Sequence, residues 1–171
     1  ATTKISKFLD KLIRPLFDRY CRATTIVDSV DLLKQLQKNI DQGYFNASTL
    51  FIIFDISNLF TMLPQEETLQ ILAEFLREHH CETVNGHSIE TIVELARIVL
   101  QVNAFVSGNK FYRQIIGGAM GSPFTLTLAN IFMWKWQKEA ILSKLPPNQF
   151  FGRFVSSETH PFRFVFYLLL S

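Results

Sequence analysis

Apolar residues recur every three or four positions along most of the chain, a spacing that predicts a series of amphipathic helices. The first helix is expected from Lys4 to about Cys21, with a kink or a break at Pro15, because proline lacks the N–H that an inner helical turn needs. The second is marked at both ends, by Asp28 as its N-cap and by Gly43 after its last turn. Its apolar face comprises Val30, Leu33, Leu36 and Ile40.

The pattern changes at residues 49–54, TLFIIF, where β-branched and aromatic residues follow one another without polar alternation. Such a run predicts a buried strand. Pro64 then opens a helix at its first turn, where a missing N–H costs nothing. The apolar face of that helix comprises Leu69, Leu72, Ala73 and Leu76. Ser88 starts the next helix, whose apolar positions are Ile89, Ile92, Val93, Ala96 and Leu100.

The second half of the chain predicts a hairpin, a long helix and a last strand. The turn letters SGN separate two strand-like runs, NAFV and KFYRQII;. A glycine-rich bend, GGAMG, leads to Ser122 as an N-cap and Pro123 as the first helical residue, and this helix is expected to run to about Ser143. FFGRFV then reads as one more strand. This order of elements predicts an α+β, or mixed α/β, fold with helices covering a small sheet, and one domain is the simplest organisation.

Composition excludes a disordered chain, since 48% of the 171 residues are hydrophobic and only 19% are charged;. The net charge of +2 fits a nucleic-acid binder but does not require one;. Cys21 and Cys81 are isolated, which predicts reduced thiols in an intracellular protein, nuclear or cytoplasmic. No signal peptide opens the sequence and its apolar end is too short to span a bilayer, so we expect no membrane partner. The four histidines are expected at the surface or at helix ends.

Asp55 follows the apolar run directly and has two interpretations. It could cap the turn formed by the next residues, Ser57 and Asn58. Alternatively it could emerge into a cleft as a metal ligand, because hard divalent cations prefer carboxylate oxygens. One carboxylate does not build such a site, so the second interpretation needs a partner.

The glycine-rich bend is the second candidate. Gly117, Gly118 and Gly121 permit positive φ angles and close approach of another chain or ligand. The first N–H groups of the following helix form a weak anion site, but no lysine completes a Walker motif. Both a simple connector and a binding loop fit this pattern. Ser122 has no histidine and aspartate at recognisable positions, so a capping role suffices for it.

Together, FDISNLFTMLP and YRQIIGGAMGSPFTLTLANIFM resemble two sequence blocks of reverse transcriptases, above all those of the Penelope-like retroelement family. There the first block commonly reads FD-x-x-x-LFT-x-[IL]P and the second G-x-AMGSP-x-x-x-x-LAN. The likeness extends upstream to ISKFLDKLIRPLFD and downstream to FFGRFV, so it covers nearly the whole chain. It implies the palm of an RNA-directed DNA polymerase, a nucleotidyltransferase, with a small antiparallel sheet, partial fingers and no thumb.

The resemblance also implies roles for single residues. Asp55 would bridge two divalent cations, Mg²⁺ or Mn²⁺, and the carbonyl of Ile56 would add a ligand. Phe60 would stack under the sugar and exclude a 2′-hydroxyl, with core packing as its alternative. The other residues implied to contact the deoxynucleotide triphosphate are Ser57, Asn58, Leu59, Met120 and Gly121. Those implied to contact an RNA or DNA template-primer are Lys110, Arg113, Gly118 and Ser122.

One block departs from the family. The strand after the long helix reads approximately FGRY-x-DD there and FGRFVSS here, so Ser156 and Ser157 replace two aspartates. Neutral hydroxyls do not balance the charge of two cations, so we expect weak or absent metal binding and no polymerisation. Glu158 lies one or two positions late, and a shift of one residue reverses the face of a strand.

The resemblance divides the sequence into a helical finger-side segment (1–48), a palm (49–157) and a divergent tail (158–171). The basic finger strands and the thumb are expected to lie outside it. Two alternatives to a degenerate polymerase stay open. One is a nucleic-acid-binding or interaction module whose phosphate contacts come from Lys110, Arg113, Arg97 and Arg153. The other is a product without present function, whose strand edges and apolar tail would self-associate.

Overall fold

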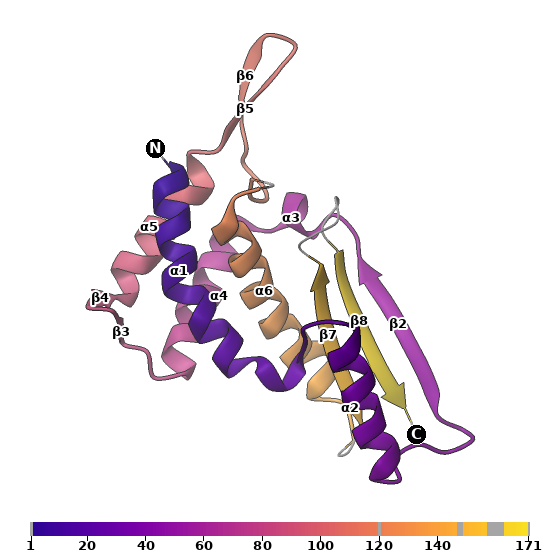
Figure 1. The fold of residues 1–171 in the computed structure, drawn as a ribbon. Coiled ribbons are helices and arrows are strands. Elements are labelled where there is room, and N and C mark those ends of the chain that lie inside the picture. Colours follow the sequence, from indigo (N-terminus) through magenta and orange to yellow (C-terminus); the bar gives the residue numbers. More distant parts are fainter. Residues whose placement is uncertain (1, 120, 147–148, 157–162, 171) are drawn as a thin grey trace. The chain divides into compact units, whose positions relative to one another are not determined.

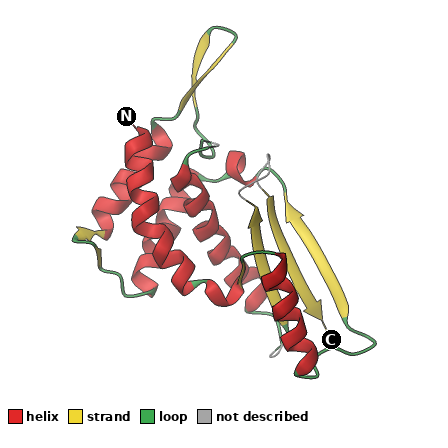
Figure 2. Ribbon diagram, in the orientation of Figure 1, coloured by secondary structure: helices red, strands yellow, loops and turns green. Residues whose placement is uncertain are grey.

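The structure is a computed structural model that describes residues 2–119, 121–146, 149–156 and 163–170. Its helices are α1 (Thr2–Tyr20), α2 (Ser29–Asp41), α3 (Leu59–Met62), α4 (Gln65–Glu78), α5 (Ile89–Gln101) and α6 (Pro123–Gln137), with a 3₁₀ turn η1 (Arg22–Thr24) and a π-helical turn η2 (Lys138–Leu142). The strands are β1 (Thr25–Ile26), β2 (Leu50–Ile56), β3 (Thr83–Val84), β4 (His87–Ser88), β5 (Ala104–Ser107), β6 (Lys110–Arg113), β7 (Phe150–Ser156) and β8 (Arg163–Leu170). The fold is α+β, as the sequence predicts (Figure 2).

The chain forms two compact units, and each combines two separate stretches of sequence. We call them the helical unit, Ala1–Tyr20 with Asn58–Gln137, and the sheet unit, Cys21–Ser57 with Lys138–Ser171. The helical unit holds α1, α3, α4, α5 and α6, and the sheet unit holds α2 and the four-stranded sheet (Figure 1). Both units are therefore assembled from residues distant in sequence.

In the helical unit, α6 packs against both α1 and α4, and α5 packs against the same two helices. Its core side chains are at most 1% exposed and lie at helical spacing: Leu9, Ile13, Leu69, Leu72, Phe75, Leu76, Ile92, Ala96, Phe124, Leu128 and Ile131. Phe75 contacts Trp134 edge-on, with 5.1 Å between ring centroids. The predicted apolar face of α4 is thereby confirmed, since all four of its residues are buried.

The sheet unit contains four strands in the order β1-β7-β8-β2. β8 pairs antiparallel with β7 on one side and with β2 on the other, whereas β1 pairs parallel with β7. Leu32 and Leu36 of α2 pack on a small core formed by Ile26, Phe150 and Leu169. Gly152 leaves room for this core, because a Cβ there would lie 2.4 Å from the Cδ1 atom of Ile26.

β8 is the longest of the elements that the sequence prediction missed, the others being β1, α3, β3 and β4. Residues 163–170 belong to the segment set apart as a tail, yet they form the strand between β7 and β2. Their apolar run, RFVFYLLL, suits a strand with neighbours on both sides;. Pro161 and Ser171 flank the run in the sequence, so a strand could have been predicted there, whereas its place between β7 and β2 could not;.

Two predictions of burial were wrong. β2 is an edge strand within the described sheet, and Leu50, Phe51 and Ile53 are 62%, 46% and 55% exposed. On α2, the predicted face is only partly right: Leu36 packs on the sheet together with Leu32, whereas Val30, Leu33 and Ile40 are exposed. Periodicity identified the strand and the helix, but the surface that each buries depends on its neighbours in space.

The predicted helix boundaries mostly hold. A carboxylate oxygen of Asp28 accepts the Asp31 N–H at 2.7 Å, and the Ser88 hydroxyl accepts the Thr91 N–H at 3.3 Å. Pro64 is the N-cap of α4 rather than its first residue. The break expected at Pro15 is wrong, since α1 continues through it to Tyr20. No helix in the described ranges is both long and apolar enough to cross a membrane.

The two apolar faces lead to a first prediction. Leu72→Ala should destabilise the protein by about 2–5 kcal/mol, because it removes a fully buried side chain and leaves a cavity;. Leu33→Ala, the matched control on the 65%-exposed face of α2, should change stability by less than about 0.5 kcal/mol;. Urea denaturation followed by circular dichroism measures both. Equal losses for the two variants would contradict the packing of α2.

Candidate functional site

Asp55 lies in β2, one residue before the end of the strand, and is exposed. The sheet register places it opposite Val165 of β8, and Val165 lies opposite Phe154 of β7. Its own row of the sheet thus contributes one carboxylate and two apolar residues. Ile56, the implied carbonyl ligand, ends β2 and pairs with Phe164.

Ser156, the first position of the replaced aspartate pair, is the last residue of β7 and pairs with Arg163. β8 separates it from β2, so its Cα lies about 10 Å across the sheet from that of Asp55 and about 7 Å further along it;. Ser157, the second position, and Glu158 lie outside the described residues. Within the described residues, the register therefore brings no second carboxylate to the row of Asp55.

Among the residues that the structure describes, the donor set does not fit a pair of divalent cations. Two-metal sites hold cations about 3.5–4 Å apart and need several oxygen ligands with balancing negative charge. In the described part of the chain, no group of three or more His, Cys, Asp or Glu residues is close enough to hold a metal ion. Asp55 is the only sequence-predicted carboxylate ligand, and the hydroxyl of a serine carries no charge.

The residues after Asp55 form a tight turn into α3. Asn58 has a φ of 60° and accepts the N–H groups of Thr61 and Met62 through its carbonyl. Phe60 is only 5% exposed. This burial fits the core-packing alternative for Phe60, and its implied role in selecting deoxynucleotides stays a prediction.

The glycine-rich bend packs backbone to backbone on α3, within the helical unit. Gly117 donates its N–H to the Leu63 carbonyl and Gly118 to the Phe60 carbonyl, both at 2.8 Å. A Cβ on Gly117, whose φ is 77°, would lie 2.5 Å from the Phe60 oxygen. Gln65 adds a third link by donating to the Gly117 carbonyl at 2.9 Å. Two blocks about sixty residues apart in sequence are thus joined by main-chain hydrogen bonds.

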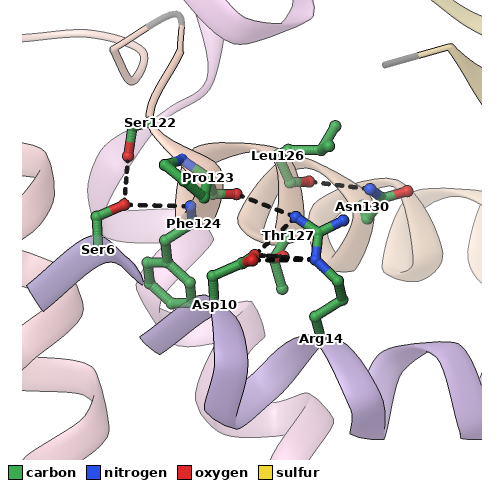
Figure 3. A network of polar contacts seen from close by, with 9 residues as sticks. All are labelled: Ser6, Asp10, Arg14, Ser122, Pro123, Phe124, Leu126, Thr127 and Asn130. Atoms are coloured by element: carbon green, nitrogen blue, oxygen red, sulfur yellow. Dashed lines mark hydrogen bonds and ion pairs between the residues drawn. The ribbon is translucent and has the colours of Figure 1, made fainter. Parts of the chain in front are cut away.

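The start of α6 is held by α1 rather than by its own cap (Figure 3). The Ser6 hydroxyl accepts the Phe124 N–H at 3.2 Å and contacts the Ser122 hydroxyl at 2.7 Å. One turn further along α1, Asp10 accepts the Thr127 hydroxyl at 2.6 Å and pairs with Arg14. Ser122 lies at the N-cap position directly before Pro123, as expected, but the Phe124 N–H is accepted by the hydroxyl of Ser6 rather than by that of Ser122.

Gly121 and Ser122 line a pocket of about 230 Å³ in the helical unit, together with Thr2, Thr3, Ser6, Val99, Asn103, Ala119 and Pro123. This volume is below the range of about 300–1,000 Å³ that is usual for ligand pockets. Gly118 makes no room for a ligand either, since a Cβ there would lie 2.5 Å from the Thr125 Cγ2 atom. Met120 lies outside the described residues. Nucleotide contacts at this bend stay a prediction.

The four basic residues expected at phosphates have different surroundings. Arg153 is fully buried and donates to the Thr25 hydroxyl at 3.3 Å, and burial lowers its pKa to about 10. Arg97 is paired with Glu66 and Glu94, and the hydrogen bond with Glu66 raises its pKa. Lys110 and Arg113 are exposed on the β5–β6 hairpin. The expectation that Arg153 contacts phosphate is therefore wrong, whereas Lys110 and Arg113 stay accessible.

Comparison with known proteins bears on the fold. The chain is similar to the solved structure of apo telomerase from Candida tropicalis, truncated from its C-terminal domain, with a TM-score of 0.59 and 15% sequence identity. The chain has a reverse-transcriptase-like fold. The match covers 96% of this chain and 34% of the telomerase chain, so the chain spans about a third of that structure. No family model and no curated protein matches the sequence.

Sequence reasoning missed three residues that support this fold. Ser6, Asp10 and Gln65 bind the glycine-rich bend or the start of α6. Ser6 and Asp10 lie four residues apart on one face of α1, a spacing that the sequence displays. Their partners are more than 110 residues away, so no local pattern connects them.

The close contact at Gly117 leads to a second prediction. Gly117→Ala and Gly121→Ala both place a side chain at a φ of 77° or 88°, which costs about 1–2 kcal/mol;. Gly121 has open space for a Cβ, whereas the Cβ at Gly117 meets the main chain of Phe60 and Thr61. Gly117→Ala should therefore lower the free energy of unfolding by at least about 1 kcal/mol more than Gly121→Ala. Thermal denaturation compares the two, and equal losses would exclude the steric contact.

Proposed function

We propose that this chain is a reverse-transcriptase-like domain that does not polymerise nucleotides. The proposal rests on two observations. Asp55 is the single carboxylate in its row of the sheet, and Ser156 and Ser157 stand in the sequence where the Penelope-like family has two aspartates. The telomerase-like fold supports descent from a polymerase. The blocks FDISNLFTMLP and GGAMGSP support the finer assignment to a Penelope-like retroelement.

The physical reason is electrostatic. Two divalent cations bring four positive charges to one site, and their mutual repulsion is strong at a separation of about 4 Å. Carboxylates from separate strands offset this repulsion in a polymerase. Asp55 supplies one negative charge, and replacing two aspartates by serines removes two. The chain is therefore expected to bind Mg²⁺ weakly or not at all, and nucleotide polymerisation, which depends on the metal ions, is expected to be lost.

A primer-extension assay tests this proposal. The chain, incubated with a primed RNA or DNA template, deoxynucleotides and either Mg²⁺ or Mn²⁺, should extend no primer, because the metal pair cannot assemble. An active reverse transcriptase run in parallel verifies the template and the nucleotides. Template-dependent addition of deoxynucleotides by this chain would refute the proposal.

Metal binding can be restored in part by substitution. The double variant Ser156→Asp with Ser157→Asp should bind Mn²⁺ at least about tenfold more tightly than the unmodified chain, as measured by the loss of the free Mn²⁺ signal in electron paramagnetic resonance. Adding Asp55→Asn to that variant should reverse the gain, since one ligand is removed again. A gain that survives Asp55→Asn would show that the new aspartates bind metal elsewhere.

A second function is favoured by the β5–β6 hairpin, which carries two accessible cations. We infer that the chain binds the backbone of RNA or DNA through Lys110 and Arg113. Among the described residues, neither side chain forms an ion pair, so both charges are available to phosphates;. From Val102 to Gly121 the sequence contains no aspartate or glutamate that would repel a polyanion.

The salt dependence of binding tests this function. Affinity for a labelled oligonucleotide should fall as salt rises, with a slope of log Kd against log salt of about 0.7 for each phosphate met on a single strand. Lys110→Ala with Arg113→Ala should reduce that slope by about 1.4. Arg97→Ala is the matched control, because its guanidinium is already paired with Glu66 and Glu94, and it should leave the slope unchanged. A slope near zero in the unmodified chain would exclude phosphate binding.

A further inference from the structure

The β5–β6 hairpin projects from the helical unit beyond the ends of α1 and α5 (Figure 1). Its two strands pair Ala104 with Arg113, Phe105 with Tyr112, Val106 with Phe111 and Ser107 with Lys110. Gly108 and Asn109 form the turn at φ angles of 55° and 61°, the conformation that a tight two-residue hairpin needs;. The register is therefore set by the turn, and it decides which side chains share a face.

Each face of the hairpin carries aromatic and cationic side chains in a different arrangement. Residues opposite one another lie on the same face, and successive pairs alternate. One face, which we call the paired-ring face, holds Phe105, Tyr112, Ser107 and Lys110. The opposite face, which we call the single-ring face, holds Val106, Phe111, Ala104 and Arg113.

On the paired-ring face, the rings of Phe105 and Tyr112 stack with their centroids 5.5 Å apart and their planes at 18°. They are nevertheless 52% and 45% exposed, so their outer surfaces meet solvent. Lys110 lies two residues from Tyr112, about 7 Å along the same strand;. The two rings hold each other in one orientation, so a third flat ring can add to the stack without ordering them first.

The hairpin exposes contiguous apolar side chains. Phe111 is 84% exposed and Val106 60%, and every residue of both strands is exposed. Contiguous exposed apolar surface commonly marks an interaction site. The charged side chains of the hairpin are the cations Lys110 and Arg113. A complementary partner is therefore negatively charged and also carries flat apolar rings that can contact Phe105 and Tyr112.

We propose that the paired-ring face is a stacking platform for unpaired bases of a single-stranded nucleic acid, with Lys110 at the adjacent phosphate. This proposal rests on the nucleic-acid-binding function inferred above and specifies its form. Bases of a single strand expose their faces to aromatic side chains, whereas those of a duplex are stacked on one another. The platform therefore prefers a single strand over a duplex, and stacking alone does not distinguish DNA from RNA.

Fluorescence anisotropy with the full chain tests the platform. The probes are fluorescein-labelled dT12 and U12, in which stacking between neighbouring bases is weak, and a 12-base-pair duplex. Tyr112→Ala should weaken binding of both single strands about tenfold, since one base loses its stacking partner. Tyr112→Phe should retain the affinity, because the ring is kept.

Phe111→Ala is the matched control, with the neighbouring aromatic residue removed from the single-ring face. It should change the affinity less than about twofold. All of these side chains are exposed, so circular dichroism spectra and melting temperatures should be unchanged;. Lys110→Ala should lower the salt slope by about 0.7.

The outcomes separate this proposal from the function on which it rests. If the unmodified chain binds single strands but Tyr112→Ala and Phe111→Ala weaken binding equally, or if the duplex binds more tightly, the platform is refuted and nucleic-acid binding stands. If the unmodified chain binds no probe, both fall. Self-association that is lost in Phe111→Ala, with no oligonucleotide bound, would assign the hairpin to a second copy of this chain instead.

Discussion

The helical unit depends on a main-chain contact that only glycine permits. The Gly117 and Gly118 N–H groups bind the carbonyls of Leu63 and Phe60, and this contact fixes the glycine-rich bend against α3. Any Cβ at Gly117 would lie 2.5 Å from the Phe60 oxygen, closer than the van der Waals contact distance of the two atoms. Because buried main-chain groups must be paired, the contact also satisfies donors that the bend would otherwise leave open. The two blocks that resemble a polymerase are therefore joined by a contact that the fold itself needs, whether or not the chain is catalytic.

In the function that we propose, charge rather than shape separates this chain from an active polymerase. The antiparallel order β7-β8-β2 supplies the strands on which carboxylates could converge. Shape alone does not hold a cation, since hydration must be replaced by ligands of matching charge and number. β2 carries one aspartate and the sequence has serines after Val155, and the proposed loss of activity rests on this difference in charge. A likeness in fold does not by itself carry an activity, because fold and function depend on different residues.

The fate of the cations shows why local sequence is a poor guide to binding residues. Arg153 and Arg113 have similar neighbours in sequence, since each has an aromatic residue on one side. Arg153 lies in β7 beside β1 and is enclosed, with its guanidinium at the Thr25 hydroxyl. Arg113 lies at the end of a projecting hairpin and is exposed. Burial makes one of them part of the core of the protein, whereas exposure leaves the other available to a partner.

Several features followed from the sequence alone because their causes are local. Caps at Asp28 and Ser88, the glycine turn between β5 and β6, and the apolar face of α4 depend on residues within a few positions of one another. The location of Asp55 near the end of a strand also followed from the apolar run before it. Only the tertiary structure decided that β8 is a central strand, that β2 lies at an edge and that α2 exposes Leu33. The cap that Ser6 supplies to α6 and the burial of Arg153 belong to the same class, since each depends on contacts across more than 110 residues, which no local pattern encodes.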